Sequence, residues 1–194
     1  MSEIKIVEKP DEVSWDEIHE VIWNAHAKNR ENGVFMGNPS LPGEEIRKKV
    51  EGKGIMVVAL DDHQLIGTAA IIKKRMKLWC GAEEYAYFCF DAVLPTHQGM
   101  GIYKKMNQLR EETAKSYGMN KVALDTNKDN LREIEVVKKN GFKPVALRKY
   151  GDHYNIVFVK WFDGCPHSVF RLKFEFTIRA IKLKTKAFIK RLIK

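Results

Sequence analysis

The stretch AVLPTHQGMGIYKKMNQL, residues 92–109, contains a pattern suited to binding a phosphate group. An apolar run ends at Pro95, glycines follow at Gly99 and Gly101, and a helical pattern begins directly afterwards. The first amides of a helix lack partners within the helix and carry the positive end of its dipole. Since a glycine has no side chain to hold a ligand away, this turn suits a phosphate or pyrophosphate. The alternative is a tight strand-to-helix turn that binds no ligand.

Two well-known phosphate-binding loops do not fit this stretch. A Walker A loop requires the pattern G-x-x-x-x-G-K-[ST], which is absent here. A dinucleotide-binding loop requires a third glycine, and Lys104 occupies that position. The strands before the turn also have an antiparallel pattern, whereas a dinucleotide-binding loop lies within a parallel unit.

The stretch instead resembles motif A of the GNAT superfamily of N-acetyltransferases, V-x-P-x-x-[RQ]-x-x-G-x-[GA]. The positions that match in register are Val93, Pro95, Gln98 and Gly101. A second segment, NLREIEVVKKNGF, resembles the family's next helix, which begins with Asn and ends in a Gly-Phe pair. Asn130, Gly141 and Phe142 match that pattern. The two motifs lie at the separation that the family shows.

The resemblance implies acetyl-CoA as the cofactor. The backbone amides that would bind its pyrophosphate belong to Gln98, Gly99, Met100, Gly101, Ile102 and Tyr103. In this family the strand before the loop diverges from its neighbour, so backbone groups near Asp91 and Val93 would bind the pantetheine arm, with Asn130 alongside.

Two positions depart from the pattern. Tyr103 replaces the usual Gly or Ala, and Val137 replaces a tyrosine that serves many members as general acid.

Transfer of an acetyl group to an amine requires a neutral amine, and therefore a general base or a chain of waters. Asp91 is the predicted base, because it is an acid within an otherwise apolar strand and desolvation would raise its pKa. The alternative is that Asp91 caps a turn or accepts backbone N–H bonds. Tyr150 and Tyr154 of the last hairpin are candidates to replace the absent acid, although packing in the core or at the rim is the favoured role for both.

The acceptor pocket is predicted between the last hairpin and the loop NRENGVFMGNPSLPG. Trp23, Phe35 and Met36 could line it, or could belong to the core. We expect the acceptor to be a primary amine on a small molecule or a peptide. The acetyl group would pass to it directly, in a ternary complex. The residues do not identify that amine.

The order of elements predicts a mixed-sheet α/β domain, and the resemblance implies the GNAT acyl-CoA N-acyltransferase fold, with which this order agrees. Hydrophobic periodicity and turn residues give the order β, α, α, β, β, β, α, β, α, β, β from Ile4 to about Phe162. Three adjacent strands in the middle predict an antiparallel meander, and the strand–helix–strand unit after it predicts a parallel pair. We assign residues 1–163 to this domain and 164–194 to a C-terminal extension.

Composition is that of a globular protein with a real core: 194 residues, 44% hydrophobic and 30% charged. No apolar run approaches the length of a transmembrane helix, and the N-terminal residues lack a signal-peptide hydrophobic region, so we expect a cytoplasmic protein. Three cysteines with no metal-ligand spacing indicate neither a disulfide framework nor a metal site; these are Cys80, Cys89 and Cys165.

The basic charge belongs to the C-terminal extension. Residues 164–194 hold nine Lys/Arg and one acid, whereas residues 1–163 hold 25 basic and 24 acidic residues. No nucleic-acid partner is therefore expected for the main domain. Apolar positions of residues 170–192 fall on one helical arc, which predicts a basic amphipathic helix, although 170–178 also alternate like a strand.

The extension leaves two interpretations open. It could pack on its own domain or on a sister subunit in a homodimer, or it could bind an anionic membrane surface or an acidic partner through residues 168–194. Two functional alternatives to the enzyme also stand: an acyl-CoA-binding sensor that has lost turnover, and a membrane- or nucleic-acid-associated protein defined by this extension.

Overall fold

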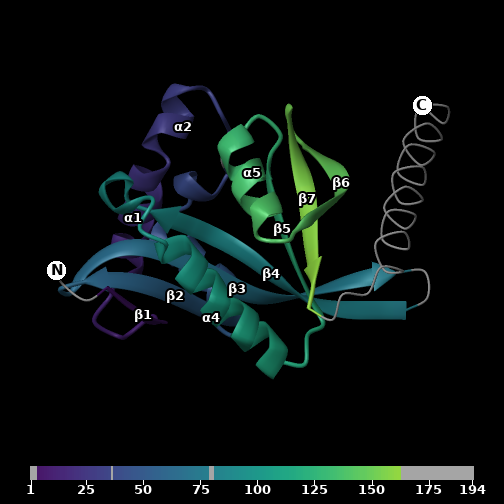
Figure 1. The fold of residues 1–194 in the computed structure, drawn as a ribbon, viewed down its shortest axis with the longest axis horizontal. Helices are drawn as coiled ribbons and strands as arrows, with labels where there is room; N and C mark the ends of the chain where they lie inside the picture. Colours follow the sequence, from purple (N-terminus) through teal and green to yellow (C-terminus); the bar gives the residue numbers. More distant parts are fainter. Residues whose placement is uncertain (1–3, 36, 79–80, 163–194) are drawn as a thin grey trace.

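Seven strands form one mixed sheet with helices on both faces (Figure 1). The computed structural model describes residues 4–35, 37–78 and 81–162. The strand order across the sheet is β1-β2-β3-β4-β5-β7-β6. The strands are β1 (Lys5–Glu8), β2 (Gly54–Asp61), β3 (Gln64–Leu78), β4 (Gly81–Val93), β5 (Lys121–Asn127), β6 (Lys143–Tyr150) and β7 (His153–Trp161).

Five α-helices connect these strands at the positions that the sequence pattern predicts, with one addition. The helices are α1 (Trp15–Ala25), α2 (Ala27–Glu31), α3 (Gly43–Val50), α4 (Ile102–Ser116) and α5 (Leu131–Lys139). The sequence indicates a first helix that stops near residues 29–33, whereas in the structure α1 ends at Ala25 and the last part forms the separate short helix α2, which carries no apolar stripe. Ser14 and Glu17 form the predicted capping box at the start of α1.

The helices divide between the two faces of the sheet. On one face, α1 and α3 bury Ile18, Ile22 and Ile46 against β2, β3 and β4. On the other face, α4 and α5 bury Met106 and Val137 in separate clusters with the same sheet. The predicted meander is confirmed, since β2, β3 and β4 pair antiparallel, and the predicted parallel pair is β4 with β5.

The parallel pair β4–β5 separates after a short contact. The two strands pair only at Ala86 with Val122 and at Tyr87 with Ala123. Beyond Tyr87, β4 continues to Val93 on the side of β3, while β5 continues beside β7. The second half of β4 therefore has one edge turned toward the gap that opens between the two strands.

A β-bulge shapes that second half of β4. The register between β3 and β4 shifts around Ala69, so that Phe90 and Asp91 together oppose one residue. Phe90 has φ of 58°, a conformation that is uncommon for a residue with a side chain. The hydroxyl of Thr68 donates to the carbonyl of Phe90 at 2.9 Å, which holds the bulge in place. The bulge changes the direction of the strand directly at Asp91.

The predicted amphipathic extension, including residues 168–194, lies outside the described residues, and so does Met36. The boundary between residues 163 and 164 stays a prediction. Within the described part of the chain, no helix is both long and apolar enough to cross a membrane. The same residues hold no group of three or more His, Cys, Asp or Glu side chains that could bind a metal.

Candidate active site

The glycine turn leads from β4 into α4 and leaves the first amides of the helix open. Gly99 and Gly101 have φ of 85° and 77°, in the left-handed region that favours glycine. A Cβ atom built at either residue would meet no heavy atom within 4 Å. Among the described residues no side chain caps α4, so the amides of its first turn lack partners within the helix. This geometry suits a phosphate or pyrophosphate.

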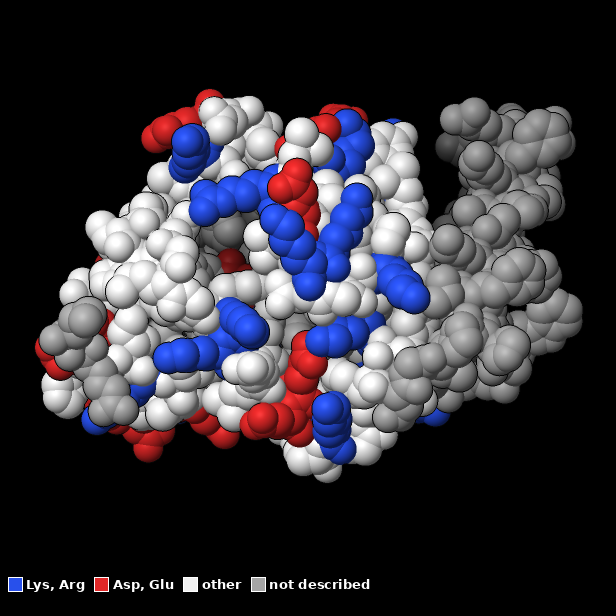
Figure 2. All heavy atoms as spheres, in the orientation of Figure 1, with Lys and Arg blue, Asp and Glu red and all other residues white. Residues whose placement is uncertain are grey.

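A cavity of about 790 Å³, here called the loop cavity, opens beside this turn. Figure 2 shows the hollow between the start of α4 and α5, with lysine and arginine side chains around it. The basic side chains that line the loop cavity are Lys28, Lys104 and Arg132. The predicted binding residues that line it are Asp91, Val93, Gln98, Gly99, Gly101, Ile102, Tyr103 and Asn130. Met100 is exposed and is not among the described lining residues.

The diverging edge of β4 presents backbone carbonyls that already have one protein donor each. His26 Nε2 lies 3.0 Å from the carbonyl oxygen of Asp91, and Gln98 Nε2 donates to the carbonyl of Val93 at 3.0 Å. Since a carbonyl oxygen accepts two hydrogen bonds, both groups can accept one more from a ligand. Gln98 therefore has a role in the structure beyond its backbone amide, because its side chain ties the loop to β4.

His26, at the junction of α1 and α2, is neutral and has both ring nitrogens engaged. Burial lowers the pKa of His26. A carbonyl can only accept, so Nε2 carries the hydrogen and donates to Asp91. Nδ1 then accepts from the side-chain amide of Asn29 at 3.3 Å. His26 thus fixes the edge of β4 and is not available as a base. The sequence offers no local signal for this contact.

Asp91 lies at the bulge and forms an ion pair with Arg110 of α4. Arg110 is fully buried, and it also donates to the carbonyl of Ala70 at 3.0 Å and to the side-chain oxygen of Asn107. Burial raises the pKa of the Asp91 carboxyl, and the charge of Arg110 opposes that rise. Neither Arg110 nor Asn107 was expected from the sequence, where both look like ordinary polar positions of an amphipathic helix.

Glu133, in the first turn of α5, is a second partly buried carboxyl that sequence reasoning missed. Its Oε2 accepts from Thr126 Oγ1 at 2.9 Å and from Asn130 Nδ2 at 2.6 Å. Burial raises the pKa of Glu133 to about 7, and the negative charge of Asp91 adds to that rise. Asn130 itself is buried and caps α5, as predicted. A pKa near neutrality suits a group that takes up a proton during a reaction.

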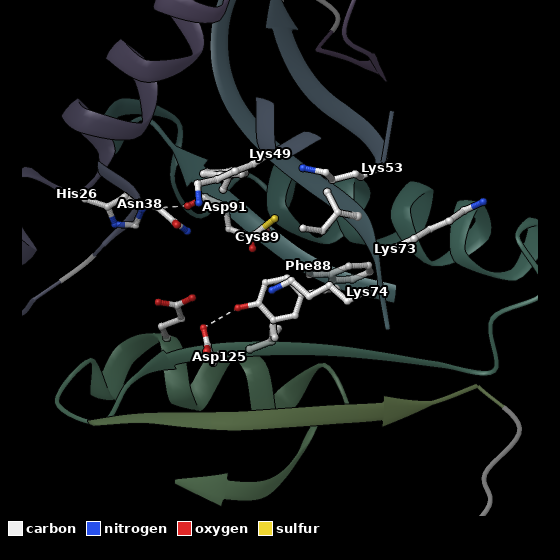
Figure 3. Close-up of a pocket in the computed structure, with 15 residues that line it drawn as sticks. His26, Asn38, Lys49, Lys53, Lys73, Lys74, Phe88, Cys89, Asp91 and Asp125 are labelled. Atoms are coloured by element: carbon white, nitrogen blue, oxygen red, sulfur yellow. Dashed lines mark hydrogen bonds between the residues drawn. The ribbon is translucent and has the colours of Figure 1, made fainter. Parts of the chain in front are cut away.

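A second cavity, of about 380 Å³ and here called the lysine cavity, lies in the gap between β4 and β5 (Figure 3). Its floor includes Tyr87, Phe88 and Cys89 of β4 together with Asp125 of β5. The two cavities share three lining residues, which are His26, Asp91 and Glu133. The two cavities therefore meet beside the bulge of β4, and Glu133, whose pKa is about 7, lies at this junction. If a ligand were bound in each cavity, one end of each ligand would lie at the junction.

Other predicted residues are not among the described residues that line either cavity. Val137 is fully buried in the core, so no group of this residue can reach a ligand. Tyr150 is exposed, and its hydroxyl donates at 3.2 Å to Asp125, which lines the lysine cavity. Trp23 is exposed beneath the guanidinium of Arg30, and Phe35 stacks on the ring of His153. Neither Trp23 nor Phe35 is among the described residues that line a cavity.

Comparisons with known proteins give the family and the fold of this chain. A family model described as the acetyltransferase (GNAT) family matches residues 15–142. An acetyltransferase from Streptococcus agalactiae 2603 has a TM-score of 0.64 at 15% identity over 81% of this chain and 98% of that one. PaiA N-acetyltransferase from Thermoplasma acidophilum, solved with coenzyme A, has a TM-score of 0.60 at 17% identity over 82% and 99%.

An aminoglycoside 6'-N-acetyltransferase, also solved with coenzyme A, has a TM-score of 0.60 at 16% identity over 81% of this chain and 96% of that one. At such identities these likenesses establish the fold. No curated protein sequence matches this chain significantly.

Proposed function

The chain belongs to the GNAT acetyltransferase family, and we propose that it transfers the acetyl group of acetyl-CoA directly to a primary amine. The observation that carries this proposal is the meeting of the two cavities at Asp91 and Glu133. Acetyl-CoA would occupy the loop cavity with its pyrophosphate on the amides of residues 98–103. The amine would enter from the lysine cavity. Both substrates would then be present together in a ternary complex.

The loop cavity fits a ligand that carries several negative charges. The open helix amides after Gly101 and the side chains of Lys28, Lys104 and Arg132 provide positive charge along it. The free edge of β4 at Asp91 and Val93 provides backbone groups for an extended amide-containing arm, as an added strand would use them. Coenzyme A combines these two chemical features. Coenzyme A in two similar solved structures agrees with this assignment.

The chemistry requires a group that removes a proton from the amine. The base first takes a proton from the ammonium, and the lone pair of the neutral nitrogen then attacks the thioester carbonyl. A C–N bond forms, the C–S bond breaks, and a second proton passes from the nitrogen to the leaving thiolate, so that the products are the amide and the CoA thiol. We assign the proton to Glu133, because its pKa of about 7 matches that task and only Oε2 is engaged by the described donors. Asp91 stays a prediction for the same role, although its Oδ1 is paired with Arg110.

Positioning supplies much of the rate in such a reaction, because it replaces a bimolecular encounter by a bound pair of reactants. The leaving thiolate still gains from a hydrogen-bond donor, and Val137 cannot provide one. Tyr103 lines the loop cavity and is the phenol among its described lining residues. Burial raises the pKa of Tyr103, so its hydroxyl keeps its proton and can donate. We assign that contribution to Tyr103.

Calorimetric titration of acetyl-CoA tests this proposal, with Gly101→Glu as the disrupting variant. The added carboxylate would repel the pyrophosphate and fill its space. Gly118→Glu is the matched control, because Gly118 lies at the other end of α4 with φ of 71° and equally open surroundings. We expect micromolar binding to the original protein and to the control, and none to Gly101→Glu. A folded original protein that does not bind acetyl-CoA would contradict the proposal.

A further inference from the structure

The lysine cavity carries positive charge on the side away from the glycine turn. Four lysines line it, namely Lys49 of α3, Lys53 before β2, and Lys73 and Lys74 of β3. Its carboxyls are Asp91, Asp125 and Glu133. In Figure 3, Lys49 lies beside Asp91, whereas Lys73 points away from the cavity. Glu133 stands at the junction with the loop cavity, and the four lysines line only the lysine cavity.

Lys74 is the lysine that points into this space (Figure 3). Its Nζ lies 3.2 Å from the centroid of the Tyr87 ring, in the floor of the cavity. Within the described residues Lys74 forms no ion pair with a carboxylate. Burial lowers the pKa of Lys74, Cys89 and the carboxylate of Asp125 oppose that effect, and the positive charges of Arg148 and Lys49 add to it. An anion bound here would relieve the cost of burying the ammonium group.

The other lysines differ from Lys74 in where their ammonium groups lie. Lys73 is the next residue on the strand, and its Nζ lies over the Tyr117 ring at 4.0 Å, on the opposite face of the sheet. Lys53 donates to the carbonyl of Lys48 at 2.8 Å. Lys49 is exposed and forms no ion pair within the described ranges. Lys74 and Lys49 are thus the two lysines positioned to bind a ligand anion.

The carboxyls of the cavity cancel this charge only in part. Asp91 is neutralised by Arg110. Asp125 keeps its negative charge, but both of its oxygens already accept hydrogen bonds, from Tyr87 at 2.7 Å and from Tyr150 at 3.2 Å. Glu133 is the remaining carboxyl, and it stands where the cavity meets the loop cavity. A polycationic amine would therefore place its additional charges beside lysines.

We propose that the acceptor is a small primary amine that carries an anionic group, with its nitrogen toward Glu133 and its carboxylate or phosphate on Lys74 and Lys49. The cavity of about 380 Å³ has the size of a small-molecule site. Glu133 at the junction and the two lysines within the lysine cavity give such a substrate one orientation, because reversing it would place the anion beside Glu133 and the ammonium beside Lys74. This inference rests on the proposed acetyl transfer and specifies its acceptor.

Matched amine pairs titrated calorimetrically into the CoA-bound full-length chain test this inference. The pairs are γ-aminobutyrate against butylamine and phosphoethanolamine against ethanolamine, so that each pair differs by the anionic group. We expect at least one anionic amine to bind about tenfold or more tightly than its neutral counterpart, as a charge-assisted contact would give. The pair with the larger difference distinguishes a carboxylate from a phosphate.

Three variants locate the effect. Lys74→Gln should abolish most of the preference, Lys74→Arg should retain it, and Lys73→Gln should leave it unchanged despite the same loss of charge on the same strand. Equal affinities within both pairs, no measurable binding of any anionic amine, or an unaltered preference in Lys74→Gln would each overturn the inference. Acetyl-CoA binding without such a preference would contradict this inference alone, whereas loss of CoA binding would contradict both proposals.

Discussion

The guanidinium of Arg110 donates to the carboxylate of Asp91, and this ion pair connects the interior side of α4 to the place where the two cavities meet. Arg110 has no exposed surface, whereas Asp91 lines both cavities. The guanidinium also lies 4.0 Å from the centroid of the Phe88 ring. Since a buried arginine does not lose its proton, Asp91 is the counter-charge that the fold requires. A substitution of Asp91 therefore affects stability as well as chemistry.

Asp91→Ala should lower the free energy of unfolding by about 3 kcal/mol, because it leaves the charge of Arg110 buried without its carboxylate. Urea unfolding followed by circular dichroism measures this. The double variant Asp91→Ala with Arg110→Met is the matched control, and it should recover much of the loss since no unpaired charge remains. A double variant whose loss equals the sum of the two single losses would show that the ion pair carries no coupling energy.

Glu133→Gln should remove the ascending step near pH 7 from the profile of kcat/KM. Glu133 must be ionised to accept a proton, and its pKa is about 7, so activity should rise with pH through that value in the original protein. We expect the variant to lose about 100-fold in rate, while the glutamine can still accept from Thr126 and Asn130. Steady-state rates with an amine that carries an anionic group measure this profile. A range from about pH 5.5 to about pH 8.5 covers both sides of that pKa.

Glu135→Gln serves as the control for this profile, because Glu135 belongs to the same helix and is exposed. It should leave the profile unchanged. Persistence of the step in Glu133→Gln together with its disappearance in Asp91→Asn would assign the base to Asp91 instead.

Glu133 should also make folding stability depend on pH. Its pKa rises from an ordinary value of 4.5 to about 7 on folding, so the folded state binds the proton more tightly than the unfolded state. The contribution is fully present below the ordinary value and is lost as pH rises through about 7, by up to about 3 kcal/mol. Urea unfolding at pH 5 and pH 8 should show a smaller difference for Glu133→Gln than for the original protein. Identical differences would show that Glu133 titrates normally.

The elements that surround the site were predictable because their signals are local. A strand–turn–helix unit is visible within one stretch of the chain. Its signals are a proline, then Gly99 and Gly101 one residue apart, then a helical period. The Asn130 cap and the Gly141 terminus are the local signals of α5. The resemblance to one family then assigned a ligand to the turn. In segments that carry their own capping and turn residues, tertiary contacts did not change the secondary structure that the sequence predicts.

The groups nearest the chemistry were not predictable in the same way. His26 and Asp91 are 65 residues apart in the chain, and their contact exists only because α1 packs across the end of β4. Glu133 lies three residues after Asn130, which caps the helix. This spacing is typical of helix capping, so the sequence gives no sign of a catalytic role for Glu133. Only the divergence of β4 from β5 places this carboxyl between two cavities. Phe90, with its positive φ, carries no sequence signal for the bulge.

Tyr103 should contribute to turnover through its hydroxyl. The motif normally has Gly or Ala at this position, whereas here a phenol lines the loop cavity together with Asp91. Burial and the negative charge of Asp91 raise its pKa, so the hydroxyl is a permanent donor at neutral pH. Tyr103→Phe removes only that donor. We expect kcat to fall roughly tenfold or more, as for loss of a hydrogen bond to a developing charge, with the Kd of acetyl-CoA unchanged.

Tyr117→Phe is the control for Tyr103→Phe, because Tyr117 ends the same helix and is not among the described residues that line either cavity. Steady-state rates with the amine panel and calorimetric titration of acetyl-CoA separate turnover from binding. If Tyr103→Phe retains full kcat, the leaving thiolate needs no donor from this residue, and positioning of the two substrates accounts for the rate without it. If Kd rises instead, the hydroxyl contacts the bound cofactor in its ground state.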